Sequence, residues 1–234
     1  MINNSLKQLF GDTFLKSFET PWSGTLCDWA KQNISLHNNY AIIGNFDVSI
    51  SRYLIEPLEC LRNNNITQVN IVAATQTGKT LISEIYIPWI ISQCPGPTLK
   101  LSQSDDMAKT AIESRLYPLL TNCKDIRKLL NEDSMTKGAI KLSNMYVKIA
   151  GAKENVLHGQ SIQYLMMDEV WQYSEGVVEK AKARTTAFGN TKKIIISSQP
   201  GIEGDQLDKE HIKQAIQYFD NHKQAKKRNS KIRN

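Results

Sequence analysis

Several features that mark other classes of protein are missing from this chain of 234 residues. No stretch approaches the 18 consecutive apolar residues of a membrane-spanning helix, and the N-terminus lacks the basic and then apolar layout of a secretory signal. The four cysteines lie far apart, with no CxxC pair and no histidine at ligand spacing, so neither a disulfide scaffold nor a zinc module is indicated. We expect a cytoplasmic protein with reduced thiols and no membrane partner.

What remains is the composition of a globular protein, with 41% hydrophobic and 22% charged residues. The length favours one principal domain. The net charge of +6 comes from residues 221–234, which hold six Lys or Arg and no acid. Such a tail suits a polyanion such as nucleic acid, and a merely solvated terminus is the alternative interpretation.

The pattern along the chain predicts three parts: a polar preface over residues 1–60, a core over 61–204, and a C-terminal helix with the basic tail over 205–234. In the core, short apolar runs alternate with helical stretches, which is typical of an α/β fold with a mainly parallel sheet flanked by helices. The expected strands are residues 68–73, 97–102, 163–168 and 192–197, with a β-hairpin inserted at the sheet edge over 139–151. The expected helices are residues 53–65, 78–93, 104–120 and 176–188.

The strongest motif is the segment AATQTGKT, residues 73–80, which follows an apolar strand and opens a helix. A phosphate-binding loop requires this context, because it points backbone N–H groups and a helix N-terminus at a nucleotide. Lys79 would reach the β- and γ-phosphates, and the hydroxyl of Thr80 would bind Mg²⁺. The predicted nucleotide-binding residues are Ala73, Gln76, Thr77, Gly78, Lys79 and Thr80. An ordinary strand-to-helix turn with a surface lysine is the alternative.

Two carboxylates follow the third apolar run, at the edge where open α/β sheets bind ligands. We assign Asp168 to the metal ion and Glu169 to the base that orients the attacking water. The fourth run ends in Ser197, Ser198 and Gln199, polar side chains that can sense the γ-phosphate. Capping of strands by acids or polar turns is the alternative explanation.

The chemistry also needs a cation that neutralises charge in the transition state, and residues 74–77 contain no Arg or Lys. Arg184 and Arg115 are the candidates, acting within the chain or on the nucleotide of a neighbouring subunit. A surface salt bridge is the alternative role for each. The loop with His158 and Gly159, near Lys153, is a candidate contact for DNA or for a neighbouring subunit.

Together these segments resemble the ATPase domain of the large subunit of phage terminases, in the lambda-type branch. The resemblance covers about residues 20–205 and includes PWSGTLCDWAKQNISL, ATQTGKT, YLMMDEVWQYS and ARTTAFGNTKKIIISSQPGIEG. It implies a P-loop NTPase of the additional-strand type, with catalytic residues Lys79, Glu169 and Arg184 and the cofactors ATP and Mg²⁺. His158 and Gln160 stand where the family tends to have arginine.

The resemblance further implies a motor that hydrolyses ATP to drive double-stranded viral DNA into a capsid in the cytoplasm of an infected bacterium. Its partners would be DNA bound without sequence readout, other copies in a homo-oligomeric ring, the viral portal and the terminase small subunit. We expect no nuclease in this chain, because few residues follow the coupling motif. Two alternatives stay open: a helicase-like enzyme, and a nucleotide-dependent assembly or regulatory module with little hydrolysis.

Overall fold

The computed structural model describes residues 22–199 except 137 and 144. A seven-stranded sheet has the order β3-β9-β8-β4-β7-β6-β5. Its strands are β3 (Gln68–Val72), β4 (Thr98–Ser102), β5 (Met135–Thr136), β6 (Ala139–Lys141), β7 (Tyr146–Gly151), β8 (Tyr164–Met167) and β9 (Lys193–Ser198). The pairs from β3 to β7 are parallel, and β6 and β5 continue the sheet antiparallel. The predicted mainly parallel sheet is therefore confirmed.

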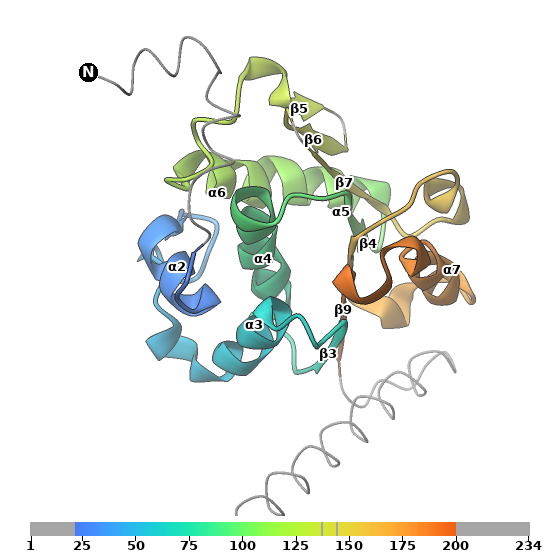
Figure 1. Ribbon diagram of the computed structural model, residues 1–234, viewed down its shortest axis with the longest axis horizontal. Coiled ribbons are helices and arrows are strands. Elements are labelled where there is room, and N and C mark those ends of the chain that lie inside the picture. The colour runs from blue at the N-terminus through green and yellow to red at the C-terminus, as the bar shows by residue number, and fades with distance from the viewer. Residues whose placement is uncertain (1–21, 137, 144, 200–234) are drawn as a thin grey trace, which may run out of the picture.

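Helices cover both faces of this sheet. They are α2 (Leu26–Asn33), α3 (Ile55–Arg62), α4 (Lys79–Gln93), α5 (Asp105–Ala111), α6 (Tyr117–Asn122) and α7 (Val177–Ala183). Figure 1 views the sheet nearly edge-on, with α7 on one side and the other helices, α4 among them, on the opposite side. No helix in the described part of the chain is both long and apolar enough to cross a membrane.

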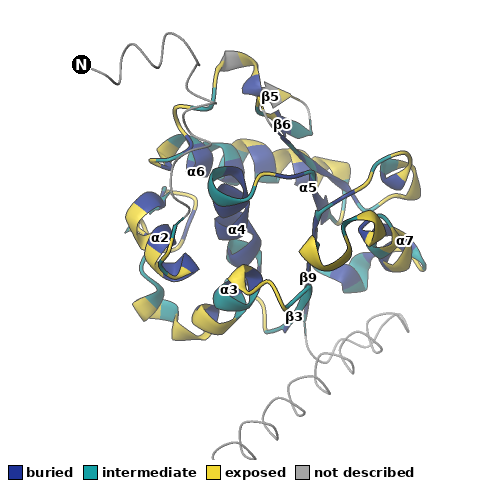
Figure 2. Cartoon of the chain, in the orientation of Figure 1, coloured by how far each residue is buried: buried dark blue, intermediate teal, exposed yellow. Residues whose placement is uncertain are grey.

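Helix α4 lies at the centre of the molecule. Most of its residues from Ile82 to Ile91 are fully or almost fully buried, and Figure 2 shows the helix dark blue along most of its length. It contacts α2, α3 and β9, so apolar side chains are needed on all its sides. Leu26, Trp29 and Leu58 belong to the same hydrophobic cluster as α4. The described part of the preface is thus continuous with the core.

The expected helix over 104–120 begins as predicted, with the Ser104 hydroxyl accepting a hydrogen bond from Met107 N at 3.2 Å. It is not one regular helix, because a π-helical turn, η2 (Ile112–Leu116), separates α5 from α6. The expected helix over 176–188 is shorter than predicted: α7 ends at Ala183, and a 3₁₀ segment, η6 (Thr186–Thr191), follows.

The hairpin expected over 139–151 is present as β6 and β7, whose register pairs Lys141 with Tyr146. It is more than an insertion, since β7 also pairs in parallel with β4 and so extends the main sheet. A small separate sheet joins β1 (Ser35–Leu36) to β2 (Gly44–Asn45) in the preface. The predicted helix after residue 205 and the basic tail lie outside the described residues.

Candidate nucleotide site at the carboxyl edge of the sheet

The loop between β3 and α4 has the backbone of a phosphate-binding turn. Gly78 precedes the first residue of α4 with φ of +84°, a conformation that glycine adopts without steric cost. Gln76 has φ of +58° although it carries a side chain. Ala73 N donates to Ser198 O at 3.2 Å, which joins the start of the loop to the end of β9. The N-terminus of α4 therefore opens at the carboxyl edge of the sheet.

Lys79 is folded back onto this loop. Its side chain is only 4% exposed, and its Nζ donates to Ala73 O at 2.7 Å and to Ala74 O at 3.0 Å. The same nitrogen lies 3.1 Å from Glu169 Oε1. The lysine and the acid, about 90 residues apart in sequence, thus form an ion pair across the site.

A second contact joins the same two segments. Thr80 Oγ1 donates to Asp168 Oδ2 at 2.7 Å, and the Ser197 hydroxyl donates to Asp168 Oδ1. Ser197 Oγ also accepts from Glu169 N at 3.3 Å. Ser197 is therefore placed between the two acids, where a sensor of phosphate was predicted.

The strand order explains why these groups meet. Strand β9 lies between β3, which leads into the loop, and β8, which leads into the acids. All three strands are parallel, so their carboxyl ends share one edge. The inserted β9 is the additional strand that the family resemblance implied.

The hydroxyl of Thr80 and the carboxylate of Asp168 fit a magnesium ion, which prefers hard oxygen ligands and keeps several waters or phosphate oxygens. Within the described residues, no group of three or more His, Cys, Asp or Glu side chains could hold a metal ion alone.

The turn after β8 contains groups that the sequence did not single out. Asp168 N donates to Tyr173 Oη at 3.1 Å, and that hydroxyl donates to Leu101 O on β4 at 2.8 Å. Burial raises the pKa of Tyr173 well above its usual value, so its hydroxyl stays protonated. Trp171 Nε1 donates to Glu169 Oε2 at 2.7 Å. The only signal for Trp171 was its place two residues after Glu169.

A buried polar network lies beneath the loop, also missed from the sequence. Glu84 on α4 is almost fully buried and accepts from Tyr40 Oη at 3.1 Å, while Lys100 on β4 donates to Ser83 Oγ at 2.6 Å. Burial raises the pKa of Glu84, against the opposing effects of Lys100 and Arg115. Charged residues in a strand and in a helix interior gave no sign in the sequence that they would face each other.

The two candidate arginines do not join the acids. Arg115 lies 3.1 Å from Glu84 Oε2 and above the ring of Tyr40, so it belongs to the buried network. Arg184 O accepts from Ile162 N at 2.9 Å, just before β8 begins, which places Arg184 toward the opposite edge of the sheet from Asp168. It lines an open hollow of about 220 Å³ together with Gly159, Gln160 and Ser161.

Four candidate residues remain, two at the end of β9 and two between β7 and β8. Ser198 is buried at the end of β9 and Gln199 is half-buried directly after it. His158 is exposed, and Lys153 is exposed and pairs with Asp105 Oδ2 at 2.6 Å. Neither of these two residues is next to the acids or the loop in the contacts described above.

Comparison with known proteins fits this geometry. The family model described as "Phage terminase large subunit gpA, ATPase domain" matches residues 41–227, most of the chain. The chain belongs to this family. The terminase resemblance read from the motifs is therefore confirmed, and with it the P-loop fold. No curated protein sequence matches the chain.

The fold is shared with one of the solved terminase structures that this chain resembles. The crystal structure of the HK97 bacteriophage large terminase matches with a TM-score of 0.66 at 16% identity, over 84% of this chain and 42% of that one. The large terminase ATPase domain of Thermus phage P74-26 matches with a TM-score of 0.48 at 14% identity, over 61% of this chain and 63% of that one. The large terminase of another thermophilic bacteriophage, solved in complex with ADP, gives 0.49 at 16% identity, over 63% and 38%. The chain thus spans less than half the length of the HK97 protein.

Proposed function

We propose that this chain is the ATPase of a viral DNA-packaging motor, which hydrolyses ATP to move double-stranded DNA into a capsid. One observation carries the proposal: Lys79 and Thr80 at the start of α4 meet Glu169 and Asp168 after β8, at 3.1 Å and 2.7 Å. Such a site has two halves. One is a loop that binds phosphates, and the other is a pair of acids that bind a metal ion and a water. The terminase family supports the assignment.

Each residue has a defined task. The N-terminus of α4 and Gly78 present backbone N–H groups to the phosphates, and Lys79 turns from Ala73 O and Ala74 O toward them. Thr80 and Asp168 would hold Mg²⁺, which neutralises phosphate charge when bound. Glu169 orients the attacking water and takes up its proton. Ala73, Gln76 and Thr77 shape the loop.

In a motor, loss of the γ-phosphate must change the structure elsewhere in the molecule. Ser197 contacts both Asp168 and Glu169, and Ser198 O holds the start of the loop through Ala73 N. We assign the coupling of ATP hydrolysis to movement to Ser197, Ser198 and Gln199, because a displacement of the acids changes the hydrogen bonds at the end of β9.

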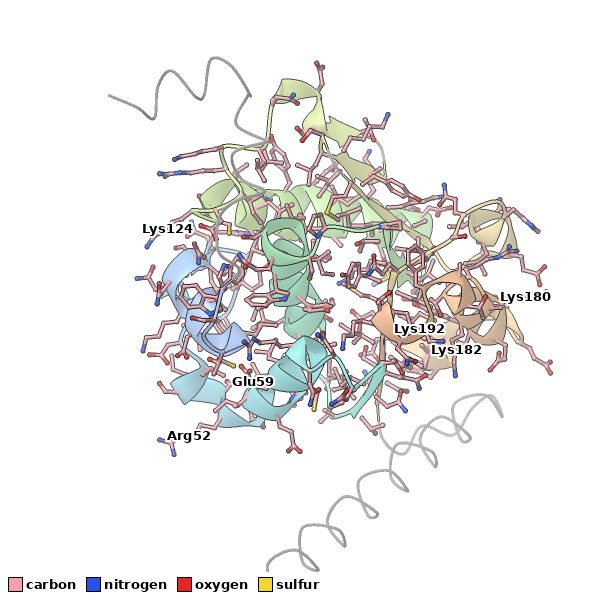
Figure 3. The ribbon with its side chains drawn as sticks, in the orientation of Figure 1. Arg52, Glu59, Lys124, Lys180, Lys182 and Lys192 are labelled. Carbon is pink, nitrogen blue, oxygen red and sulfur yellow. The ribbon has the colours of Figure 1, made fainter. Side chains whose placement is uncertain are left out.

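Arg184 lies at the opposite end of β8 from the acids of its own chain, so we assign it to the nucleotide of a neighbouring copy in a homo-oligomeric ring. Lys180, Lys182 and Lys192 lie on the same α7 side of the molecule, as Figure 3 shows. DNA would be bound through its phosphates without sequence readout, by exposed loops and the basic tail. The viral portal and the terminase small subunit would be the other partners, in the cytoplasm of the infected bacterium.

ATP turnover with and without duplex DNA tests the proposal. We expect DNA to stimulate turnover, and Lys79→Ala and Glu169→Gln to abolish it, because each removes a group at the reacting phosphate. Lys109→Ala is the matched control, since Lys109 is exposed and pairs only loosely with Glu113, at 3.9 Å. The same DNA analysed on a gel tests the expectation that this chain does not cut DNA.

Tight ATP binding with negligible turnover, both in the isolated chain and in the ring assembled on the portal, would contradict the motor. It would favour the nucleotide-dependent assembly module instead. Turnover that survives Glu169→Gln would show that another residue is the base.

A further inference from the structure

The carboxylate of Glu169 is held from two sides. Oε1 faces Lys79 Nζ at 3.1 Å, and Oε2 accepts from Trp171 Nε1 at 2.7 Å. The Glu169 side chain is 25% exposed, so it lies at the rim of the site, where water and nucleotide can reach it. Each carboxylate oxygen therefore has its own partner.

Only one of these two partners can stay during the proposed reaction. Lys79 must turn toward the β- and γ-phosphates, which removes it from Glu169 Oε1. That oxygen is then available for the attacking water. A carboxylate on three rotatable side-chain bonds would otherwise sample several orientations, and catalysis needs one of them. The hydrogen bond from Trp171 Nε1 involves the other oxygen, Oε2, so the movement of Lys79 does not remove it.

The turn that carries Trp171 is itself rigid. Tyr173 is bonded both to Asp168 N and to Leu101 O of the neighbouring strand, and Val170 is fully buried. Gln172 N donates to Glu169 O at 3.0 Å, which closes the turn on the acid. Glu169 has φ of +54° and ψ of +53°, a conformation that costs a non-glycine residue free energy and is kept only where the surroundings enforce it. The indole is thus anchored to the same turn as the carboxylate that it contacts.

We propose that Trp171 is a positioning residue, whose indole N–H fixes Oε2 of Glu169 so that Oε1 faces the attacking water once Lys79 has moved to the nucleotide. The inference rests on the proposed function, because it takes Glu169 as the base. It assigns no contact between Trp171 and the substrate. The ion pair with Lys79 then belongs to the nucleotide-free state, and the hydrogen bond with Trp171 persists through turnover.

The contact itself can be tested without any turnover. The chain has four tryptophans, Trp22, Trp29, Trp89 and Trp171, so its ¹H–¹⁵N spectrum holds four indole signals, each assignable by a Trp→Phe variant. We expect Glu169→Gln to move the Trp171 indole signal and to leave the Trp22 signal in place. A magnesium–nucleotide complex that is not hydrolysed should leave the Trp171 N–H protected from solvent exchange. A Trp171 signal that does not respond to Glu169→Gln would overturn the proposal.

Steady-state kinetics of the full chain tests the role. We expect Trp171→Phe to lower kcat about tenfold, the effect of losing one hydrogen bond to a charged group, with KM and nucleotide affinity unchanged. Trp22→Phe is the matched control, because it also loses an indole hydrogen bond, from Trp22 Nε1 to Thr25 O at 2.9 Å, at the start of α2. Unchanged signals of Trp22, Trp29 and Trp89 in Trp171→Phe would show that the fold is intact.

Different results would contradict the proposed function of Glu169 and the positioning role of Trp171. If Glu169→Gln keeps its turnover, the proposed function of Glu169 is wrong. If Glu169→Gln is inactive while Trp171→Phe keeps the kcat of Trp22→Phe, the function stands and the positioning role is wrong. A rise in KM with unchanged kcat in Trp171→Phe would also contradict it, since that pattern reports substrate binding.

Discussion

Gln76 and Glu169 are the two non-glycine residues in the described part of the chain with positive φ, and both lie at the candidate site. Such conformations cost free energy and cluster where function requires a particular backbone. The reasons differ at the two positions. Glu169 is held by contacts of its side chain with Lys79 and Trp171, whereas Gln76 is exposed on the loop. For Gln76 we therefore expect the backbone conformation to matter more than the side chain.

Substitution at Gln76 separates these two contributions. We expect Gln76→Val to lower the free energy of unfolding by about 1 kcal/mol, because a β-branched residue fits the left-handed region poorly. Gln76→Gly should be close to neutral in stability and keep its affinity for ATP. Urea unfolding and nucleotide titration measure both effects. Loss of ATP binding in Gln76→Gly at unchanged stability would mean that the amide side chain contacts the nucleotide.

Between secondary-structure elements, the contact of α4 with η2 depends on charge as well as on apolar packing. Glu84 of α4 is almost fully buried, and Arg115 of η2 is its ion-pair partner at 3.1 Å. His37 Nε2 and Asn39 Nδ2 bond the carbonyls of Arg115 and Ser114, so the preface also holds this turn. The π-helical turn is thus stabilised by segments distant in sequence.

Removal of the arginine tests this contact. We expect Arg115→Met to lower the free energy of unfolding at pH 7 by about 2 kcal/mol, less than for a fully buried pair because the Arg115 side chain is 34% exposed. The control is again Lys109→Ala, which removes an exposed pair on the neighbouring helix and should change stability by less than about 0.5 kcal/mol.

The loss should depend on pH. The pKa of Glu84 is raised in the folded protein above its ordinary value of 4.5, so its contribution to stability is greatest below that pH and is lost as pH rises through the folded pKa. Arg115 opposes the rise, and its removal raises the pKa further. The deficit of Arg115→Met should therefore shrink from pH 7 toward pH 4.5 in urea titrations. A deficit that is constant with pH would mean that Glu84 is already neutral beside Arg115 at pH 7.

Across the molecule as a whole, the preface and the nucleotide core share one hydrophobic cluster on the α4 face of the sheet. Trp29 of α2 is fully buried, meets Trp89 of α4 edge to face at 5.4 Å and donates to Asp125 Oδ2 at 3.0 Å. The second cluster, on the α7 face, includes Leu165 and Val178. Since β8 and β9 contribute to both clusters, we expect the described part of the chain to unfold as one unit.

Truncation of the buried tryptophan tests this cooperativity. We expect Trp29→Ala to lower the free energy of unfolding by about 3 to 5 kcal/mol, the usual effect of deleting a buried aromatic side chain. The loss of helical circular dichroism and the release of a bound fluorescent nucleotide should share one midpoint in urea, in the variant as in the parent. Two separate midpoints in the parent would show that the preface and the nucleotide core are independent units.

Much of the fold followed from local patterns. The predicted strands 68–73, 97–102, 163–168 and 192–197 agree with β3, β4, β8 and β9 to within a residue at either end, because continuous apolar runs bounded by turn residues are a local signal. The helix after β4 was predicted as one regular helix, and the helix after β8 was predicted too long. Their interruptions depend on tertiary contacts, such as those of the preface with η2, which no short window of sequence contains.

Local sequence was enough to choose the residues of the candidate site: the turn around Gly78 and Lys79 and the acids Asp168 and Glu169 follow from strand ends and turn chemistry, both local properties. The roles given to these residues stay predictions. Only the folded structure shows which of these side chains contact one another. The folded chain has β9 between β3 and β8, Trp171 against Glu169, and Arg184 at the opposite end of β8 from the acids. Strand order and side-chain direction arise from packing between distant segments, so they exist only in the folded molecule.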